Sequence, residues 1–249
     1  MAAWSPMCLP TPDGAITARL HRPPATDRWL VWAHGGSWRS GSSAEWHAPV
    51  SDLALAARAT VVSVDYRLVP AHRHPDALRD VLAAVMWARV QTNLPVAVGG
   101  DSAGATLAAD AALVLRDRGV RLAAQVLAYP PIDPACRAPS YRRAPAAFPD
   151  RDALRAAWAA YQGGRPHPGL YSTPAEAADL RGAPPAAIAV GVADPVIDDA
   201  RDYAARLRRA DVPVHLDEVP GLGHGAFLTS PSFRRRLAAA YVRLEENPR

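Results

Sequence analysis

Short apolar runs alternate along the chain with longer stretches of helical periodicity. The apolar runs are rich in Val, Ala and Ile and carry apolar residues on both faces, which is typical of parallel strands buried between helices. They predict strands at residues 16–20, 29–33, 60–65, 96–99, 123–128, 186–192 and 214–219. The stretches between them predict helices at residues 44–57, 75–90, 103–118, 150–161, 199–210 and 231–245.

The alternation of strands and helices predicts an α/β protein with a doubly wound, mostly parallel sheet. No helix pattern separates the strands at 16–20 and 29–33, so we expect these two to form an antiparallel pair at the edge of the sheet. The chain has 249 residues, which suits a single domain, 1–249, with enough length to bury a sheet between helices.

The segment 130–185 breaks this alternation. It is rich in Pro, Ala and Arg and contains one clear helix pattern. Long insertions in compact domains often cover a functional site. We therefore expect a cap at about 130–185, with a plain surface excursion as the alternative.

The run Gly100-Asp101-Ser102-Ala103-Gly104 joins the predicted strand 96–99 to the predicted helix 103–118. A G-x-S-x-G motif in this setting places its serine on a tight turn with the hydroxyl free above the sheet. The glycines let the backbone close, and the start of the helix directs N–H groups toward developing negative charge. Ser102 is the candidate nucleophile, and a serine N-cap on an ordinary turn is the alternative.

A second glycine-rich loop, His34-Gly35-Gly36-Ser37-Trp38, follows the predicted strand 29–33. Acyl transfer builds negative charge on the carbonyl oxygen, and backbone N–H groups held in place can stabilise it. We expect the oxyanion hole at Gly35, Gly36, Ser37 and Ala103, with Gly36, Ser37 and Ala103 as the N–H donors. His34 is interpreted as a residue that positions the loop rather than as the base.

The acid and the base are expected downstream of the serine, in the order Asp or Glu, then His. Asp194 directly follows the predicted strand 186–192, and His224 lies in a glycine-rich loop after the strand 214–219. His224 would take the proton of Ser102, and Asp194 would orient the imidazole. Asp198 and Asp199 fit better as acidic residues at the start of a helix.

The remaining composition excludes several other classes of function. The net charge is +4, and all 28 basic residues are Arg, which excludes a phosphate-loop lysine and a Schiff-base lysine. The arginines are scattered and form no nucleic-acid face. Cys8 and Cys136 have neither disulfide-framework nor zinc spacing, and His72 and His74 alone make no metal site. No membrane span or signal peptide is visible, so we expect a cytoplasmic protein.

Several segments together resemble the bacterial hormone-sensitive-lipase-like family of α/β-hydrolase esterases. They are HGGSW, VVSVDYRLVPAHRHPDALRD, GGDSAGA, AYPPIDP, DLRGAPPAAI, GVADPVIDDARDYAARLRRADVPV and GLGHGAF. The resemblance runs in order from about Pro12 to the C-terminus. It implies hydrolysis of small carboxylic esters with short or medium acyl groups and no cofactor, with Ser102, Ala103, Asp194 and His224 at the family's site positions.

The chain departs from the family at two places. Ser37 stands where the family has a third glycine, and only 33 residues precede His34, so we expect a reduced cap and a more open pocket. Two other functions stay open: an amidase, formamidase or natural-product ester hydrolase with the same triad, and a non-catalytic binding protein on the hydrolase scaffold. The sequence does not decide the oligomeric state, and a homodimer is compatible with it.

Overall fold

The protein is built on one eight-stranded sheet with the strand order β1-β2-β4-β3-β5-β6-β7-β8. The computed structural model describes residues 1–143, 147–164 and 167–246. The strands are β1 Ala3–Thr11, β2 Gly14–Arg22, β3 Arg28–Ala33, β4 Ala59–Val64, β5 Val96–Asp101, β6 Gln125–Ala128, β7 Ala186–Gly191 and β8 Val214–Val219. Strands β3 to β8 pair with one another in parallel, and β2 pairs antiparallel with β1 and β4, which confirms the predicted doubly wound, mostly parallel α/β class.

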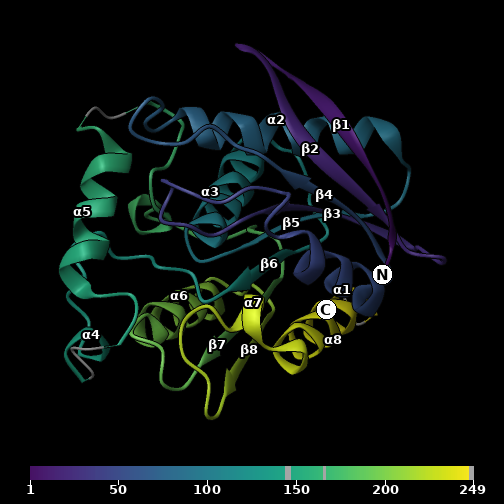
Figure 1. Ribbon diagram of the computed structural model, residues 1–249. Helices are drawn as coiled ribbons and strands as arrows, with labels where there is room; N and C mark the ends of the chain where they lie inside the picture. The colour runs from purple at the N-terminus through teal and green to yellow at the C-terminus, as the bar shows by residue number, and fades with distance from the viewer. Residues whose placement is uncertain (144–146, 165–166, 247–249) are drawn as a thin grey trace.

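Every residue of β4, β5, β6 and β7 is buried, because helices cover both faces of the sheet. Helix α1 packs against α8, and α2 packs against α3 (Figure 1). The helices are α1 His47–Ala57, α2 Asp76–Gln91, α3 Ala103–Asp117, α4 Ser140–Arg143, α5 Arg151–Gln162, α6 Ile197–Arg209, α7 Ala226–Thr229 and α8 Pro231–Glu246.

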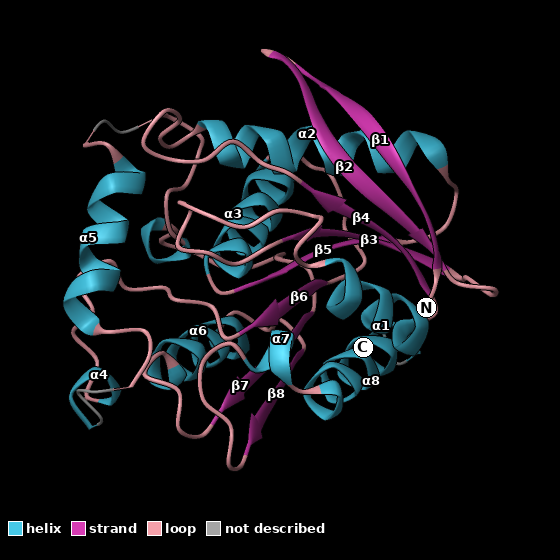
Figure 2. Cartoon of the chain, in the orientation of Figure 1, coloured by secondary structure: helices cyan, strands magenta, loops and turns pink. Residues whose placement is uncertain are grey.

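The predicted antiparallel pairing of strands 16–20 and 29–33 is wrong. Strand β2 pairs with β1 on one side and β4 on the other, and β3 lies in the interior between β4 and β5. The edge partner, β1, was not among the predicted strands, and it contains Pro6 and Pro10. Proline lacks an N–H for the ladder and is tolerated on an edge strand, which is where β1 lies (Figure 2).

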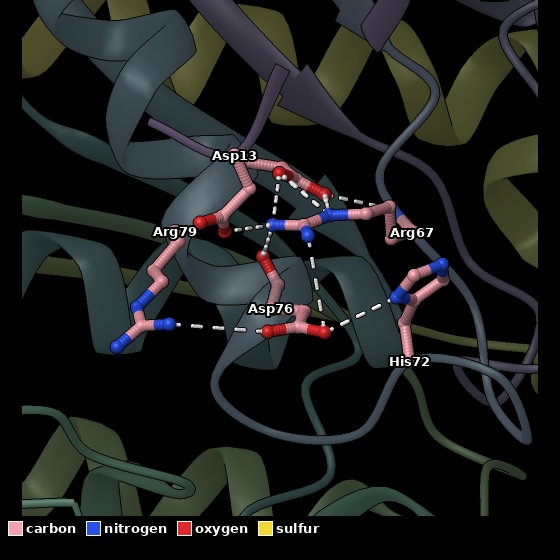
Figure 3. Close-up of polar contacts among 6 residues, drawn as sticks. Asp13, Arg67, His72, Asp76 and Arg79 are labelled. Atoms are coloured by element: carbon pink, nitrogen blue, oxygen red, sulfur yellow. Dashed lines mark hydrogen bonds and ion pairs between the residues drawn. The ribbon is translucent and has the colours of Figure 1, made fainter. Parts of the chain in front are cut away.

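Arg67 ties the β1–β2 hairpin to the start of α2 (Figure 3). Its guanidinium binds the fully buried carboxylate of Asp80 through Nε and Nη2, at 2.9 Å for the Nη2–Oδ1 pair. Nη2 also lies 3.1 Å from Asp13 Oδ2 in the hairpin turn, and Nη1 lies 3.9 Å from Asp76 Oδ2. Removing one partner of a buried ion pair is costly, so the Arg67–Asp80 pair, with its contacts to Asp13 and Asp76, holds the hairpin against the helix.

The insertion between β6 and β7 contains α4, α5 and a 3₁₀ turn, Pro174–Glu176. Figure 1 shows α4 and α5 together at one side of the molecule, apart from the helices that cover the sheet. The first residues of the insertion are held by Asp199 of α6. Its Oδ2 accepts hydrogen bonds from the N–H of Ile132 at 2.8 Å, the N–H of Asp133 at 3.0 Å and the Tyr141 hydroxyl at 2.8 Å.

Candidate active site

Ser102 occupies a strained turn between β5 and α3. Its φ of 50° and ψ of −122° lie outside the regions that serine ordinarily adopts. The turn is held because the Ser102 N–H donates to the Ala128 carbonyl at 2.9 Å, while the Ser102 carbonyl accepts from the Ala105 N–H at 2.9 Å. Strain of this kind persists only where the surroundings enforce it, and it is common at functional sites.

The two glycines of the motif are required by the close approach of three backbone segments. A Cβ atom on Gly104 would overlap the carbonyl oxygens of Ala33 and His34. A Cβ atom on Gly100 would lie 2.6 Å from the Ala33 carbonyl oxygen and would also overlap Gly104. Helix α3 can therefore begin against the end of β3 only if both positions lack a side chain.

Ser102, His224 and Asp194 form one continuous hydrogen-bonded chain. The Ser102 Oγ lies 2.8 Å from His224 Nε2, and His224 Nδ1 lies 2.9 Å from Asp194 Oδ2. The three residues come from the turn after β5 and the loops after β7 and β8, which meet at the carboxyl edge of the sheet. The Asp194 side chain is fully buried, and Oδ1 also accepts the Val196 N–H at 2.9 Å, so the carboxylate has a fixed orientation.

The loop after β3 adjoins the turn that carries Ser102, through a contact of Gly35 with Asp101. Gly36, Ser37 and Trp38 all have positive φ values, of 115°, 55° and 58°. In the part of the chain that the structure describes, the N–H groups of Gly36, Ser37 and Ala103 donate to no other group. The Gly35 N–H differs, because it donates to Asp101 Oδ1 at 3.1 Å. Three of the four residues expected at the oxyanion hole therefore have an unused donor.

Aromatic packing anchors this loop at both ends. Trp38 is fully buried and stacks on Tyr161 of α5, with ring centroids 4.6 Å apart and an interplanar angle of 9°. At the other end, His34 stacks on Tyr66 at 4.3 Å, and the Tyr66 hydroxyl donates to the His34 carbonyl at 2.8 Å. His34 is held within the loop by these contacts, as expected of a positioning residue.

Asp101, between Gly100 and Ser102, has a position that sequence reasoning did not assign. Its buried carboxylate accepts hydrogen bonds from Trp46 Nε1 at 2.8 Å and, at 3.1 Å, from the Gly35 N–H. The Tyr129 hydroxyl donates to Oδ2 at 3.4 Å. Burial raises the pKa of Asp101 to about 7, and the Trp46 and Gly35 hydrogen bonds oppose this shift. The only sequence signal for this role was the place of Asp101 within the motif.

A family model described as the alpha/beta hydrolase fold matches residues 30–228. The chain belongs to this family. The carboxylesterase NlhH of Mycobacterium tuberculosis (strain CDC 1551 / Oshkosh) is 39% identical over 228 residues, covering 84% of this chain and 70% of NlhH. The ethyl acetate hydrolase of Pseudomonas putida is 33% identical over 246 residues, covering 88% of this chain and 74% of that protein.

Solved structures agree with these relatives. The hyperthermophilic esterase from Pyrobaculum calidifontis superposes with a TM-score of 0.87 at 31% identity, over 97% of this chain and 83% of that one. This alpha/beta hydrolase is therefore a carboxylesterase-type enzyme, and its resemblance to the hormone-sensitive-lipase-like family is confirmed.

The other polar candidates of this hydrolase have contacts of their own. His72 Nδ1 lies 3.2 Å from Asp76, and His74 Nδ1 lies 3.3 Å from the Tyr161 hydroxyl. Over residues 1–143, 147–164 and 167–246, no three His, Cys, Asp or Glu side chains are grouped to hold a metal ion. None of the helices described in these ranges is long and apolar enough to cross a bilayer.

Asp198 and Asp199 lie in the first turn of α6, as expected. They also hold the insertion, because Asp198 Oδ2 accepts the Ser140 N–H at 2.9 Å beside the Asp199 contacts described above. Neither residue appears in the hydrogen-bonded chain of Ser102, which passes through Asp194.

Proposed function

We propose that this alpha/beta hydrolase cleaves carboxylic esters of short or medium acyl groups through a covalent acyl-enzyme on Ser102 Oγ. The observation that supports the mechanism is the 2.8 Å contact between Ser102 Oγ and His224 Nε2, continued at 2.9 Å to Asp194. A serine hydroxyl is a weak nucleophile at neutral pH and needs an adjacent base, which the imidazole supplies.

In the acylation step, Ser102 Oγ attacks the ester carbonyl carbon while its proton moves to His224 Nε2. The buried Asp194 carboxylate keeps the proton of the imidazole on Nδ1 and stabilises the imidazolium that forms. The tetrahedral intermediate collapses when the carbon–oxygen bond to the alcohol breaks and Nε2 returns the proton to the leaving oxygen.

Deacylation repeats the same sequence with water as the nucleophile. His224 takes a proton from the water, which attacks the acyl carbon, and the proton is returned to Ser102 Oγ as the acid leaves. The balance is one water consumed and one acid and one alcohol released, so the reaction requires no cofactor.

The N–H groups of Gly36, Ser37 and Ala103 are the proposed oxyanion donors. They are unused in the described part of the chain and lie on backbone held by Trp38 and by helix α3. Removal of one such donor typically reduces kcat by about 10²–10³-fold.

We also propose that the chain is one domain, 1–249, in which the insertion at about 130–185 acts as a reduced cap. Two observations support this. Tyr161 of the insertion stacks on Trp38 of the glycine loop, so the insertion reaches the site. The described residues before His34 form β1, β2 and β3 of the sheet, so the cap elements that the structure describes are those of the insertion.

The test uses p-nitrophenyl acetate, p-nitrophenyl butyrate and a fluorophosphonate probe on purified protein. We expect wild type to hydrolyse both esters and to be labelled. Ser102→Ala should lose about 10⁴-fold or more in kcat and all labelling, because residual catalysis from binding and oxyanion donors alone is small. Ser232→Ala, on the exposed start of α8, is the matched serine control and should keep both properties.

Labelling that persists in Ser102→Ala contradicts the mechanism, and a wild type that is neither labelled nor active contradicts the proposed function. N-formyl compounds and anilides in the same panel separate an esterase from an amidase or formamidase. Higher kcat/KM for these amides than for the esters would replace the ester assignment.

A further inference from the structure

The imidazole of His224 has aromatic neighbours of two different kinds. Tyr129 lies with its ring centroid 4.6 Å from that of His224 and is buried, with 1% of its surface exposed. Phe148 lies 5.5 Å away with an interplanar angle of 63°, and 71% of its surface is exposed. Of these two rings, only that of Phe148 is open to solvent.

Phe148 directly precedes a turn that is held by several contacts. Pro149 is buried, and Asp150 caps α5 by accepting the Ala153 N–H at 2.8 Å. Arg151 Nε donates to the Cys136 carbonyl at 3.1 Å and ties the same turn to the first part of the insertion. An aromatic side chain on an anchored turn can contact a ligand at little cost in conformational entropy.

Other exposed apolar side chains lie on the segments that carry the site. Val192 is 46% exposed and stands two residues before Asp194, and Leu228 is 39% exposed and follows His224 by four residues. Single exposed apolar residues need no explanation, whereas several on the segments that carry one site are typical of a ligand-binding rim.

The chemistry of the proposed reaction decides which part of the ester meets Phe148. His224 Nε2 must protonate the oxygen of the departing alcohol, so that alcohol lies against the imidazole. The carbonyl oxygen lies elsewhere, at the N–H groups of the glycine loop. Phe148 packs on the same imidazole as the alcohol and therefore borders the alcohol side of the scissile bond.

We infer that Phe148 is a specificity-determining residue that forms an aromatic wall of the leaving-alcohol subsite and favours esters of aromatic alcohols. The inference rests on the proposed function, because it assumes that Ser102 and His224 act on an ester. Aromatic contacts of this kind contribute beyond the area that they bury.

The experiment compares benzyl acetate with methyl acetate, which share the acyl group and differ in the alcohol. Phe148→Ala should reduce kcat/KM for benzyl acetate by about 3- to 10-fold more than for methyl acetate, the range expected for loss of one aromatic contact. Phe148→Tyr, which keeps the aromatic face, should restore most of the preference. Met86→Ala, an exposed apolar residue of α2, is the control and should leave the ratio unchanged.

A second comparison tests the assignment to the alcohol side. The ratio of p-nitrophenyl butyrate to p-nitrophenyl acetate turnover should keep its wild-type value in Phe148→Ala, because both esters share one alcohol. Equal losses for benzyl and methyl acetate, or a change in the butyrate ratio, would overturn the inference while wild-type hydrolysis stands. Absence of wild-type ester hydrolysis would instead remove the proposed function itself.

Discussion

Asp101 accepts a hydrogen bond from the Gly35 N–H at 3.1 Å, so the residue before the nucleophile holds the loop that faces it. The same carboxylate oxygen accepts the indole N–H of Trp46 at 2.8 Å. The elbow and the glycine loop come from different strands, β5 and β3, and this buried carboxylate is a polar link between them. The position of the proposed oxyanion donors relative to Ser102 therefore depends on Asp101.

We expect Asp101→Ala to reduce kcat/KM for p-nitrophenyl acetate by about 10- to 100-fold, less than the removal of Ser102, because the loop would lose its anchor but keep its N–H groups. The buried Gly35 and Trp46 donors would lose their acceptor, at a cost of about 1–3 kcal/mol each in the free energy of unfolding. Steady-state kinetics and denaturant unfolding measure the two effects.

Asp101→Asn is the matched control, since its amide oxygen can still accept these hydrogen bonds. The pKa of Asp101 is raised to about 7, so the folded protein retains this proton to a higher pH than the unfolded chain. The stability of wild type should therefore fall relative to Asp101→Asn as the pH rises from about 4 through 7. A stability difference that is constant between pH 5 and pH 8 contradicts the raised pKa.

Ser37 has a φ of 55°, a conformation that glycine adopts without strain. Ser37→Gly should raise the free energy of unfolding by about 1 kcal/mol, which is about 2–4 °C in Tm for a chain of this size. Ser37→Val should have the opposite effect, because a β-branched residue is least tolerant of positive φ. Thermal unfolding of the two variants beside wild type measures this.

The N–H of residue 37 survives both substitutions, and the serine hydroxyl donates to no described group. The kcat/KM of Ser37→Gly for esters should therefore stay within about threefold of wild type, because the backbone N–H of residue 37, and not its side chain, is the proposed oxyanion donor. A tenfold loss would show that the hydroxyl takes part in substrate binding or catalysis.

His21 is a buried histidine far from the site in sequence, and among the described residues neither ring nitrogen has a hydrogen-bond partner. Burial, with smaller contributions from His47 and Arg19, lowers the pKa of His21 to about 4. The unfolded chain takes up this proton near pH 6.5, so stability present above pH 6.5 is lost as the pH falls toward 4.

We expect the His21→Leu variant to lack this loss of stability at low pH. Wild type should lose about 1–2 kcal/mol more than His21→Leu in the free energy of unfolding between pH 7 and pH 5, as measured by urea denaturation. His21→Gln keeps a polar group without a titrating proton and should show the same reduced pH dependence. If the free energy of unfolding of all three proteins changed equally with pH, the lowered pKa of His21 would be contradicted.

The interior strands and the main helices could be predicted because each has an apolar pattern that can be recognised from its own residues. Strand β7 was expected at 186–192 and lies at Ala186–Gly191, and α5 was expected at 150–161 and lies at Arg151–Gln162. Strand β1 escaped prediction because its prolines are compatible with a strand only at the edge of a sheet. Edge position is a property of the whole sheet.

The sequence by itself determined the α/β class, the family, and the candidate roles of Ser102, Asp194 and His224. These could be recognised because tight turns and catalytic side chains require particular residue types at short spacing along the chain. Only the tertiary structure decided the order in which β4 separates β2 from β3, the attachment of Gly35 to Asp101, and the position of Phe148 against His224. These relationships join residues that are distant along the chain, and no local pattern encodes which distant surfaces come into contact.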